Sequence, residues 1–155
     1  MNLEKYQQYS RIARGLEKAD LVLKDARIVN VFTEEIIRGD IAIQDGIIAG
    51  IGSFHGKEER DLAGRYVCPG FIDSHLHLES TLVTPAELVT VASRHGTTTF
   101  IVDPHESANV SGLAGVDYIL DQTENVKANV YVMMPSCVPA TSIDDNGCTL
   151  TAEDM

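Results

Sequence analysis

The feature that most restricts the fold is a repeated order of strand, loop and helix after Pro69. The segment TTTFIVD, residues 97–103, is apolar and β-branched and predicts a buried strand. Helices are predicted on either side of it, over residues 85–95 and 112–124, and NVYVMMP, residues 129–135, predicts a further strand. This order is typical of a parallel sheet with right-handed crossovers, and it fits either a doubly wound sheet or the opening of a (β/α)8 barrel.

The first part of the chain follows a different pattern. Residues 3–18 place apolar side chains at helical spacing among charges, which predicts a short amphipathic helix. Residues 20–52 alternate short β-branched runs with turn signals, which predicts a small antiparallel sheet of hairpins. The turn signals are Lys24-Asp25, residues 33–35 and residues 44–46. The patterns divide the chain into a helix over residues 1–19, a small β-sandwich-type domain over 20–66, and an α/β part over 67–155.

Composition limits the class of partner. The chain has 155 residues, 44% of them hydrophobic, so it can bury a core. Its formal net charge of −11 argues against nucleic acid or an anionic membrane as partner and favours a small neutral or cationic substrate. The N-terminus lacks an apolar signal segment, and the three cysteines lack C-x-x-C spacing. We therefore expect a cytoplasmic protein with reduced thiols.

The stretch VCPGFIDSHLHLEST, residues 67–81, carries two histidines at the end of an apolar run. Side chains two apart on a strand lie on one side, so His75 and His77 should converge at its C-terminal end. Neutral imidazole is a frequent ligand of zinc, manganese and iron. Two interpretations are open at this point: a pair of metal ligands, or polar residues that end a strand by hydrogen bonding to loops.

Two carboxylates flank this pair. Asp73 shares the parity of His75 and His77, so it either orients an imidazole from behind or accepts hydrogen bonds from backbone amides at the strand end. Glu79 has the same parity but is expected in the loop that follows the strand. There it either contacts the metal or the substrate, or it is a loop residue without such a contact.

The segment DPHES places more titratable side chains at the end of the next strand. His105 and Glu106 follow Asp103 and Pro104, on the same edge of the sheet as the two histidines. They either bind a further ion or form a proton-transfer pair, or else the segment is a loop fixed by side-chain hydrogen bonds. Cys137, in PSCVP, has no histidine close in sequence to activate it, and we predict a wall of the pocket there.

Longer motifs carry a resemblance to a known family. The segment PGFIDSHLH resembles the start of the catalytic barrel in the metal-dependent amidohydrolase superfamily. Within that superfamily HLHLESTLVTPAEL, HGTTTFIVDPHESANVSGLAGVDYIL and MMPSCVPAT together resemble the bacterial adenine deaminases. The resemblance runs in order from about residue 20 to residue 152.

The resemblance implies a fold and an activity. The fold is a small β-sheet domain followed by the first β/α units of a (β/α)8 TIM-like barrel. The activity is hydrolysis of adenine to hypoxanthine and ammonia by metal-activated hydroxide. His75 and His77 map onto ligands of a dinuclear centre, manganese or iron with zinc as a further option, while the remaining ligands of the family lie on later strands. Under this resemblance His105 and Glu106 are the candidate catalytic residues.

Length qualifies this expectation. A (β/α)8 barrel needs about 250 residues, far more than follow Pro69, so the barrel is expected to be incomplete and the chain alone inactive. The free edge of its last strand favours a homo-oligomer. The alternatives are another amidohydrolase, acting on cyclic amides or N-acetyl groups, and a non-catalytic fragment.

Overall fold

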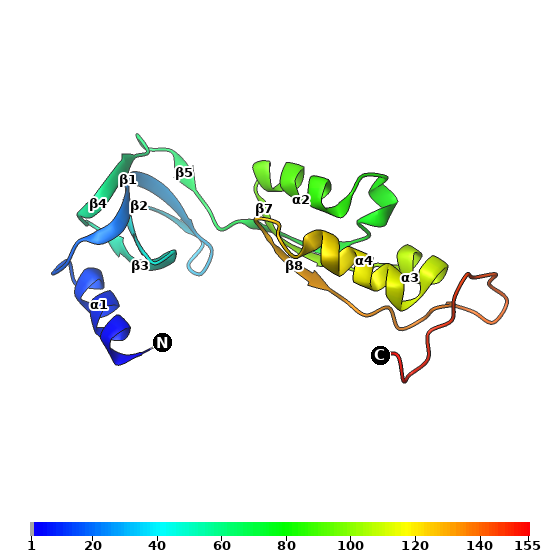
Figure 1. The fold of residues 1–155 in the computed structure, drawn as a ribbon. Coiled ribbons are helices and arrows are strands. Elements are labelled where there is room, and N and C mark those ends of the chain that lie inside the picture. Colours follow the sequence, from blue (N-terminus) through cyan, green and yellow to red (C-terminus); the bar gives the residue numbers. More distant parts are fainter. Residues whose placement is uncertain (1) are drawn as a thin grey trace. The chain divides into compact units, whose positions relative to one another are not determined.

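The computed structural model describes residues 2–155 as two compact units that divide after Pro69 (Figure 1). The first unit contains one helix and a five-stranded sheet, and the second contains a three-stranded sheet with helices. No helix within residues 2–155 combines the length and the apolar character that crossing a membrane requires.

Helix α1 (Leu3–Ala13) begins at Asn2, whose side chain accepts a hydrogen bond from the Lys5 N–H at 3.0 Å. It is shorter than the helix predicted over residues 3–18. Gly15 adopts a φ of 71°, a left-handed conformation that glycine tolerates best and that ends helices. The buried Ile12 anchors the helix in the core of the first unit.

The sheet of the first unit has the order β3-β2-β1-β4, with β5 beside β1. The antiparallel pairing of β1 with β2 and of β2 with β3 confirms the predicted hairpins. Between β2 and β3, Asp45 and Gly46 both have positive φ, as a two-residue hairpin turn of this kind requires. The strands are β1 (Ala19–Asn30), β2 (Glu35–Gln44), β3 (Ile47–Gly52), β4 (Gly56–Asp61) and β5 (Tyr66–Val67).

Two expectations for this sheet are wrong. The predicted turn at Lys24-Asp25 is a register shift inside the continuous strand β1, where Asp25 has a φ of 52°. The sheet is also mixed, because β4 and β5 pair with β1 in parallel. Parallel neighbours come from a crossover and not from a tight turn, so local turn signals do not reveal them.

The second unit is a parallel sheet in the order β6-β7-β8, which confirms the predicted strand, loop and helix order. Its strands are β6 (Phe71–Leu76), β7 (Thr97–Val102) and β8 (Asn129–Val132). Its helices are the 3-10 turn η1 (Glu79–Thr81), α2 (Pro85–Arg94), α3 (His105–Ser111) and α4 (Leu113–Thr123).

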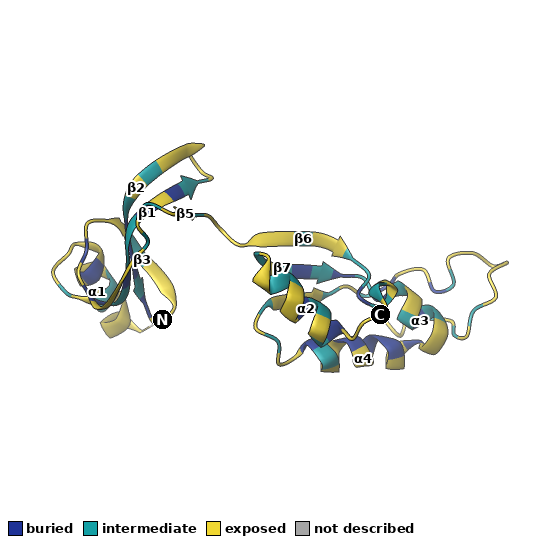
Figure 2. Cartoon of the chain, turned by 90° about the horizontal axis from the view of Figure 1, so that it is seen from above, coloured by how far each residue is buried: buried dark blue, intermediate teal, exposed yellow. Residues whose placement is uncertain are grey.

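The core of the second unit lies between the sheet and its helices. Phe100 and Val102 of β7 pack with Val89 of α2 and Ile119 of α4 in one buried cluster (Figure 2). Burial of such side chains is the main stabilising contribution of the unit. Phe71, at the start of β6, is by contrast 59% exposed. The helices therefore bury the middle strand and leave the start of β6 exposed.

Helix α3 was not predicted, because HESANVS lacks a helical stripe of apolar residues. It packs against α4, which contains Gly115. A Cβ at Gly115 would lie 2.2 Å from the Ser107 carbonyl oxygen, so only glycine permits this close approach. Gly115 is therefore what allows α3 to lie against α4.

Candidate metal centre

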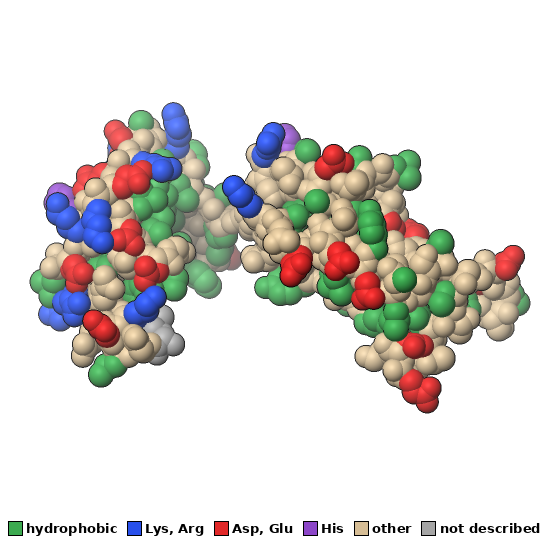
Figure 3. Space-filling view, in the orientation of Figure 1, with side chains coloured by type: hydrophobic (Ala, Val, Ile, Leu, Met, Phe, Trp, Pro, Cys, Tyr) green, Lys and Arg blue, Asp and Glu red, His purple; other side chains and the backbone are tan. Residues whose placement is uncertain are grey.

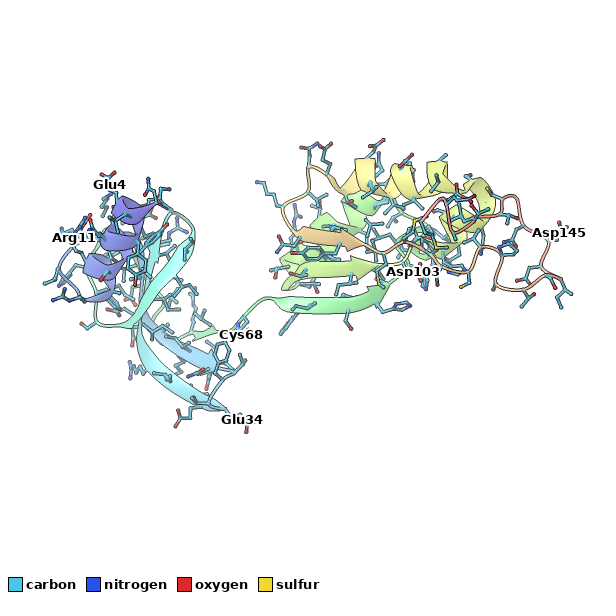
Figure 4. The ribbon with its side chains drawn as sticks, turned by 90° about the horizontal axis from the view of Figure 1, so that it is seen from below. Glu4, Arg11, Glu34, Cys68, Asp103 and Asp145 are labelled. Carbon is cyan, nitrogen blue, oxygen red and sulfur yellow. The ribbon has the colours of Figure 1, made fainter. Side chains whose placement is uncertain are left out.

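Two histidines and an aspartate come together at the C-terminal ends of β6 and β7. His75 lies in β6 and His77 follows its last residue, while Asp103 follows the last residue of β7. The Asp103 N–H donates a hydrogen bond to the Leu76 carbonyl oxygen at 2.9 Å, which joins the two strand ends. Figure 4 shows Asp103 at this end of the sheet. Parallel strands end at one edge, so their terminal side chains meet there.

The three side chains converge as a set of donors. The ring centroids of His75 and His77 are 5.0 Å apart, with the planes at 89°. One ligand atom from each histidine and one from Asp103 all lie within 4.8 Å of one another. Imidazole nitrogen and carboxylate oxygen suit manganese, iron and zinc. The arrangement can hold a divalent cation.

The ring of His77 is oriented by a backbone contact. Its Nδ1 lies 2.6 Å from the Asp103 carbonyl oxygen. A carbonyl oxygen only accepts hydrogen bonds, so Nδ1 carries the proton in this contact and Nε2 keeps the lone pair. Such a hydrogen bond behind an imidazole is how proteins fix the tautomer of a metal ligand. Nε2 is therefore the nitrogen of His77 whose lone pair is free for a ligand.

An unsatisfied oxygen lies in the same set. Asp103 Oδ1 is buried and has no hydrogen-bond partner within residues 2–155. A buried carboxylate oxygen without a partner is destabilising, and a bound cation would satisfy it. The donors present therefore fit a divalent metal.

A carboxylate pair lies behind His77. Glu106 Oε2 is 3.2 Å from His77 Nδ1, and Glu106 Oε1 accepts a hydrogen bond from the Ser80 hydroxyl at 2.6 Å. Glu79 Oε1 accepts from the backbone N–H groups of Glu106, at 3.0 Å, and Ser107, at 3.3 Å. The pair thus links η1 to the first turn of α3.

The environment shifts the pKa of these two carboxyl groups in opposite directions. Burial raises the pKa of Glu79, and the neighbouring Glu106 carboxylate raises it further. Burial also acts to raise the pKa of Glu106, but hydrogen bonds from the Ser80 hydroxyl and from Glu79 outweigh it and hold that pKa below its ordinary value. The proton of the pair is therefore favoured on Glu79, and Glu106 remains ionised.

Asp73 does not join the donors. The register between β6 and β7 shifts between Asp73 and Leu76, so the simple alternation behind its predicted position does not hold. Its carboxylate accepts a hydrogen bond from the His75 backbone N–H at 3.3 Å. Of its two interpretations, the structure supports the contact with a backbone amide at the strand end.

His105 lies beside the donors without belonging to them. Its Nδ1 is 3.9 Å from Asp103 Oδ2, and its Nε2 is 4.0 Å from the sulfur of Cys137. No histidine is close to Cys137 in sequence, but the fold brings His105 beside it. The two residues are 32 positions apart, and only the pairing of β7 with β8 brings their loops together.

Sequence reasoning placed Asp103 at the strand end without assigning it as a ligand. The available signal was its position directly after a strand parallel to the one that carries the histidines. Ser80 was missed altogether, because no local pattern indicates that its hydroxyl binds a glutamate on another element.

Comparison with known proteins bears on this geometry. Residues 66–154, more than half of the chain, match the model of the amidohydrolase family. The chain belongs to the amidohydrolase family. This confirms the resemblance found in the motifs, and it implies that the parallel β/α order of the second unit is a portion of a TIM barrel.

Similar proteins with curated names are consistent with membership of this family. The chain is 56% identical over all 155 residues to an adenine deaminase of Desulfitobacterium hafniense, of which it covers 27%. It is 53% identical over 143 residues to an adenine deaminase of Clostridium acetobutylicum, and 51% identical over 138 residues to one of Geobacillus kaustophilus. The match covers 92% and 89% of this chain, respectively, and 25% and 24% of those proteins. The chain thus spans about a quarter of the length of these relatives.

Proposed function

We propose that this amidohydrolase chain takes part in the hydrolytic deamination of adenine to hypoxanthine and ammonia, as the part of the enzyme that carries the first metal ligands. The observation that carries the proposal is the 56% identity over the whole chain to a protein named adenine deaminase. The convergence of His75, His77 and Asp103 supports it, because hydrolases of this family need a metal centre.

We propose manganese or iron as the resident metal, with zinc as a further option, in a dinuclear centre. His75 and His77 would hold one ion, His77 through Nε2, and Asp103 would offer its unsatisfied oxygen. When bound, the metal supplies a water molecule activated for attack at neutral pH.

Glu106 is the residue of this chain best suited to carry a proton. Its lowered pKa keeps it ionised, and its side chain is 52% exposed, so a substrate can reach it. A carboxylate there can accept a proton from the attacking water and return it to the departing amino group, which leaves as ammonia. His105 stays a predicted second member of this proton-transfer pair.

A chimaera tests the proposal. The 155 residues replace the matching segment of the Desulfitobacterium hafniense relative, which is possible because the match covers the entire chain. We expect the manganese-loaded chimaera to release ammonia from adenine at a rate within about tenfold of the relative, and far faster than from dihydropyrimidines or N-acetyl sugars. Ammonia release and hypoxanthine absorbance provide the measurement.

The controls separate a wrong function from a poor chimaera. The H77A chimaera should lose the activity, and the isolated chain should show no turnover, since three donors do not complete a dinuclear centre. A folded, metal-loaded chimaera that does not act on adenine while the relative does would exclude the proposed function. Preference for a dihydropyrimidine would assign the chain to another branch of the family.

Self-association of the isolated chain stays a prediction. Within residues 2–155, β8 pairs with β7 on one side only, so its other edge presents free backbone donors and acceptors. We expect size-exclusion chromatography to show dimers or larger species whose proportion rises with concentration. A monomer that persists across a hundredfold range of concentration would contradict this prediction.

A further inference from the structure

We propose that Glu79 is a positioning residue, which holds the first turn of α3 and thereby keeps Glu106 against His77. The proposal rests on the proposed function in one respect, since it takes His77 as a metal ligand. It assigns no metal contact and no proton transfer to Glu79 itself.

The first argument is the number of contacts that Glu79 makes to α3. One oxygen, Oε1, accepts hydrogen bonds from two successive backbone N–H groups, those of Glu106 and Ser107. The first N–H groups of a helix have no partner within the helix, and Pro104, which precedes α3, supplies no side-chain cap. Glu79 therefore takes the place of a local cap from 27 residues away.

The second argument is that α3 needs such support. It has seven residues, which is too short for a helix to be stable without tertiary contacts. Its other contacts lie farther along the helix, where Ser107 approaches Gly115 of α4, Ala108 packs on Val116 and Val138, and the Asn109 carbonyl oxygen accepts hydrogen bonds. At the end that carries Glu106, the remaining contacts are those of the Glu106 side chain with Ser80 and His77 and the longer ones of His105 with Asp103 and Cys137, and none of these bonds to the Glu106 or Ser107 N–H group.

The third argument connects α3 to the metal donors. Glu106 Oε2 lies 3.2 Å from His77 Nδ1, the atom that also contacts the Asp103 carbonyl oxygen. A shift of the first turn of α3 would remove this carboxylate from behind the imidazole. Residues that contact a metal-bound histidine from behind influence metal affinity by about 10-fold to 100-fold.

A direct metal contact by Glu79 is the competing interpretation, because ligand atoms of His77, Glu79 and Glu106 also lie within 4.8 Å. In that arrangement His77 Nδ1 already contacts a carbonyl oxygen, and Glu79 Oε1 already accepts two hydrogen bonds. A cation bound through His77 Nδ1 would have to displace that contact, and Glu79 Oε2, which is buried without a hydrogen-bond partner within residues 2–155, is the one oxygen of Glu79 open to it. The geometry favours the positioning role.

Two substitutions distinguish the interpretations. The amide oxygen of glutamine in E79Q can accept the same two backbone hydrogen bonds, whereas it is a poor metal ligand and cannot carry a proton. The alanine in E79A can do none of these. A positioning residue is therefore rescued by glutamine, and a ligand or proton carrier is not.

The experiment measures two properties of the 155-residue chain, neither of which depends on deamination. Hydrogen exchange at the Glu106 and Ser107 amides reports the first turn of α3, and titration with zinc alone reports the donors. For E79A we expect exchange at least about tenfold faster and zinc affinity about tenfold weaker. For E79Q we expect both values within about threefold of the native chain.

Glu87 provides the matched control, since it also lies in the first turn of a helix, α2, where it accepts a hydrogen bond from Thr84. E87A should change neither measurement at Glu106, Ser107 or the donors. The proposal is wrong if E79Q weakens zinc binding as much as E79A does, or if E79A leaves amide exchange unchanged. A chimaera inactive on adenine would remove the proposed function, while these two measurements would still decide the role of Glu79.

Discussion

Replacing His77 by alanine should weaken zinc binding by at least about 100-fold. Zinc is the suitable probe, because a site of nitrogen and oxygen donors binds it more tightly than manganese or iron. The substitution removes the donor that is oriented by the Asp103 carbonyl oxygen, and it leaves His75 and Asp103 too few to hold the ion. Competition with a chromophoric zinc chelator measures the affinity directly.

Other histidines of the chain supply the controls. H75A should produce a loss similar to that of H77A, because the two rings lie 5.0 Å apart and each offers one ligand atom to the proposed ion. H95A changes an exposed histidine at the end of α2, and H55A changes an exposed histidine in the first unit, so both should bind zinc as the native chain does. If H95A or H55A weakens binding as much as H77A, the ion is held elsewhere.

The convergence of the two histidines could be predicted, because alternation along a strand depends only on backbone geometry. The same rule failed for Asp73, since a register shift inside β6 interrupts the alternation. A shift of this kind arises from the pairing with β7, which the sequence of β6 alone does not contain. Predictions from parity therefore hold on one side of a register shift and not across it.

The parts of the site missed by the sequence depend on distant contacts. Helix α3 exists because Gly115 allows close packing and because Glu79 accepts its first N–H groups, and neither cause lies within residues 105–111. The contact between His105 and Cys137 likewise joins loops after two different strands. Local signals sufficed for the hairpin at Asp45 and Gly46, where the turn itself determines the pairing.

The positive and negative charges are distributed unevenly between the two units, which the net charge of the whole chain does not show. Arg94 and Lys127 are the only arginine and lysine after Pro69, whereas carboxylates continue through that part of the sequence. In Figure 3 the blue side chains of the second unit are accordingly few and lie at one end. The acidic character that argued against nucleic acid and anionic membranes therefore belongs mainly to the unit that contains the candidate metal ligands, and it favours the approach of cations.

The largest stability effect is expected in the first unit, at Asp40 of β2. Asp40 is 8% exposed, and its carboxylate forms an ion pair with the Lys24 ammonium. It also accepts hydrogen bonds from the backbone N–H groups of Phe54 and Asp25, both at 3.1 Å. In D40N the negative charge is lost, and the side-chain NH2 group of asparagine cannot accept hydrogen bonds from the ammonium and the two N–H groups. We therefore expect the free energy of unfolding to decrease by about 2 to 3 kcal/mol. Hydrogen exchange of β1 and β2 amides measures this unit separately from the other.

The cost of D40N should depend on pH. Burial acts to raise the pKa of Asp40, but hydrogen bonds from Lys24 and from the Phe54 and Asp25 amides outweigh it and lower that pKa. A carboxylate with a lowered pKa stabilises the folded state above the pKa of the unfolded chain, about 3.9, and this contribution is lost as the pH falls through the folded value. The difference between D40N and the native chain should therefore be constant at neutral pH and shrink below about pH 4.

A neighbouring ion pair isolates burial as the cause. Arg38 and Asp25 also join β2 to β1, at 2.7 Å, but the Arg38 side chain is 70% exposed. Water already solvates such a pair, so R38Q should change the stability too little to resolve. The prediction is wrong if R38Q lowers the free energy of unfolding as much as D40N does, or if the effect of D40N remains unchanged in strong acid. In either case the buried carboxylate would not control the stability of this sheet. The comparison works because the two pairs share their strands and differ mainly in their access to water.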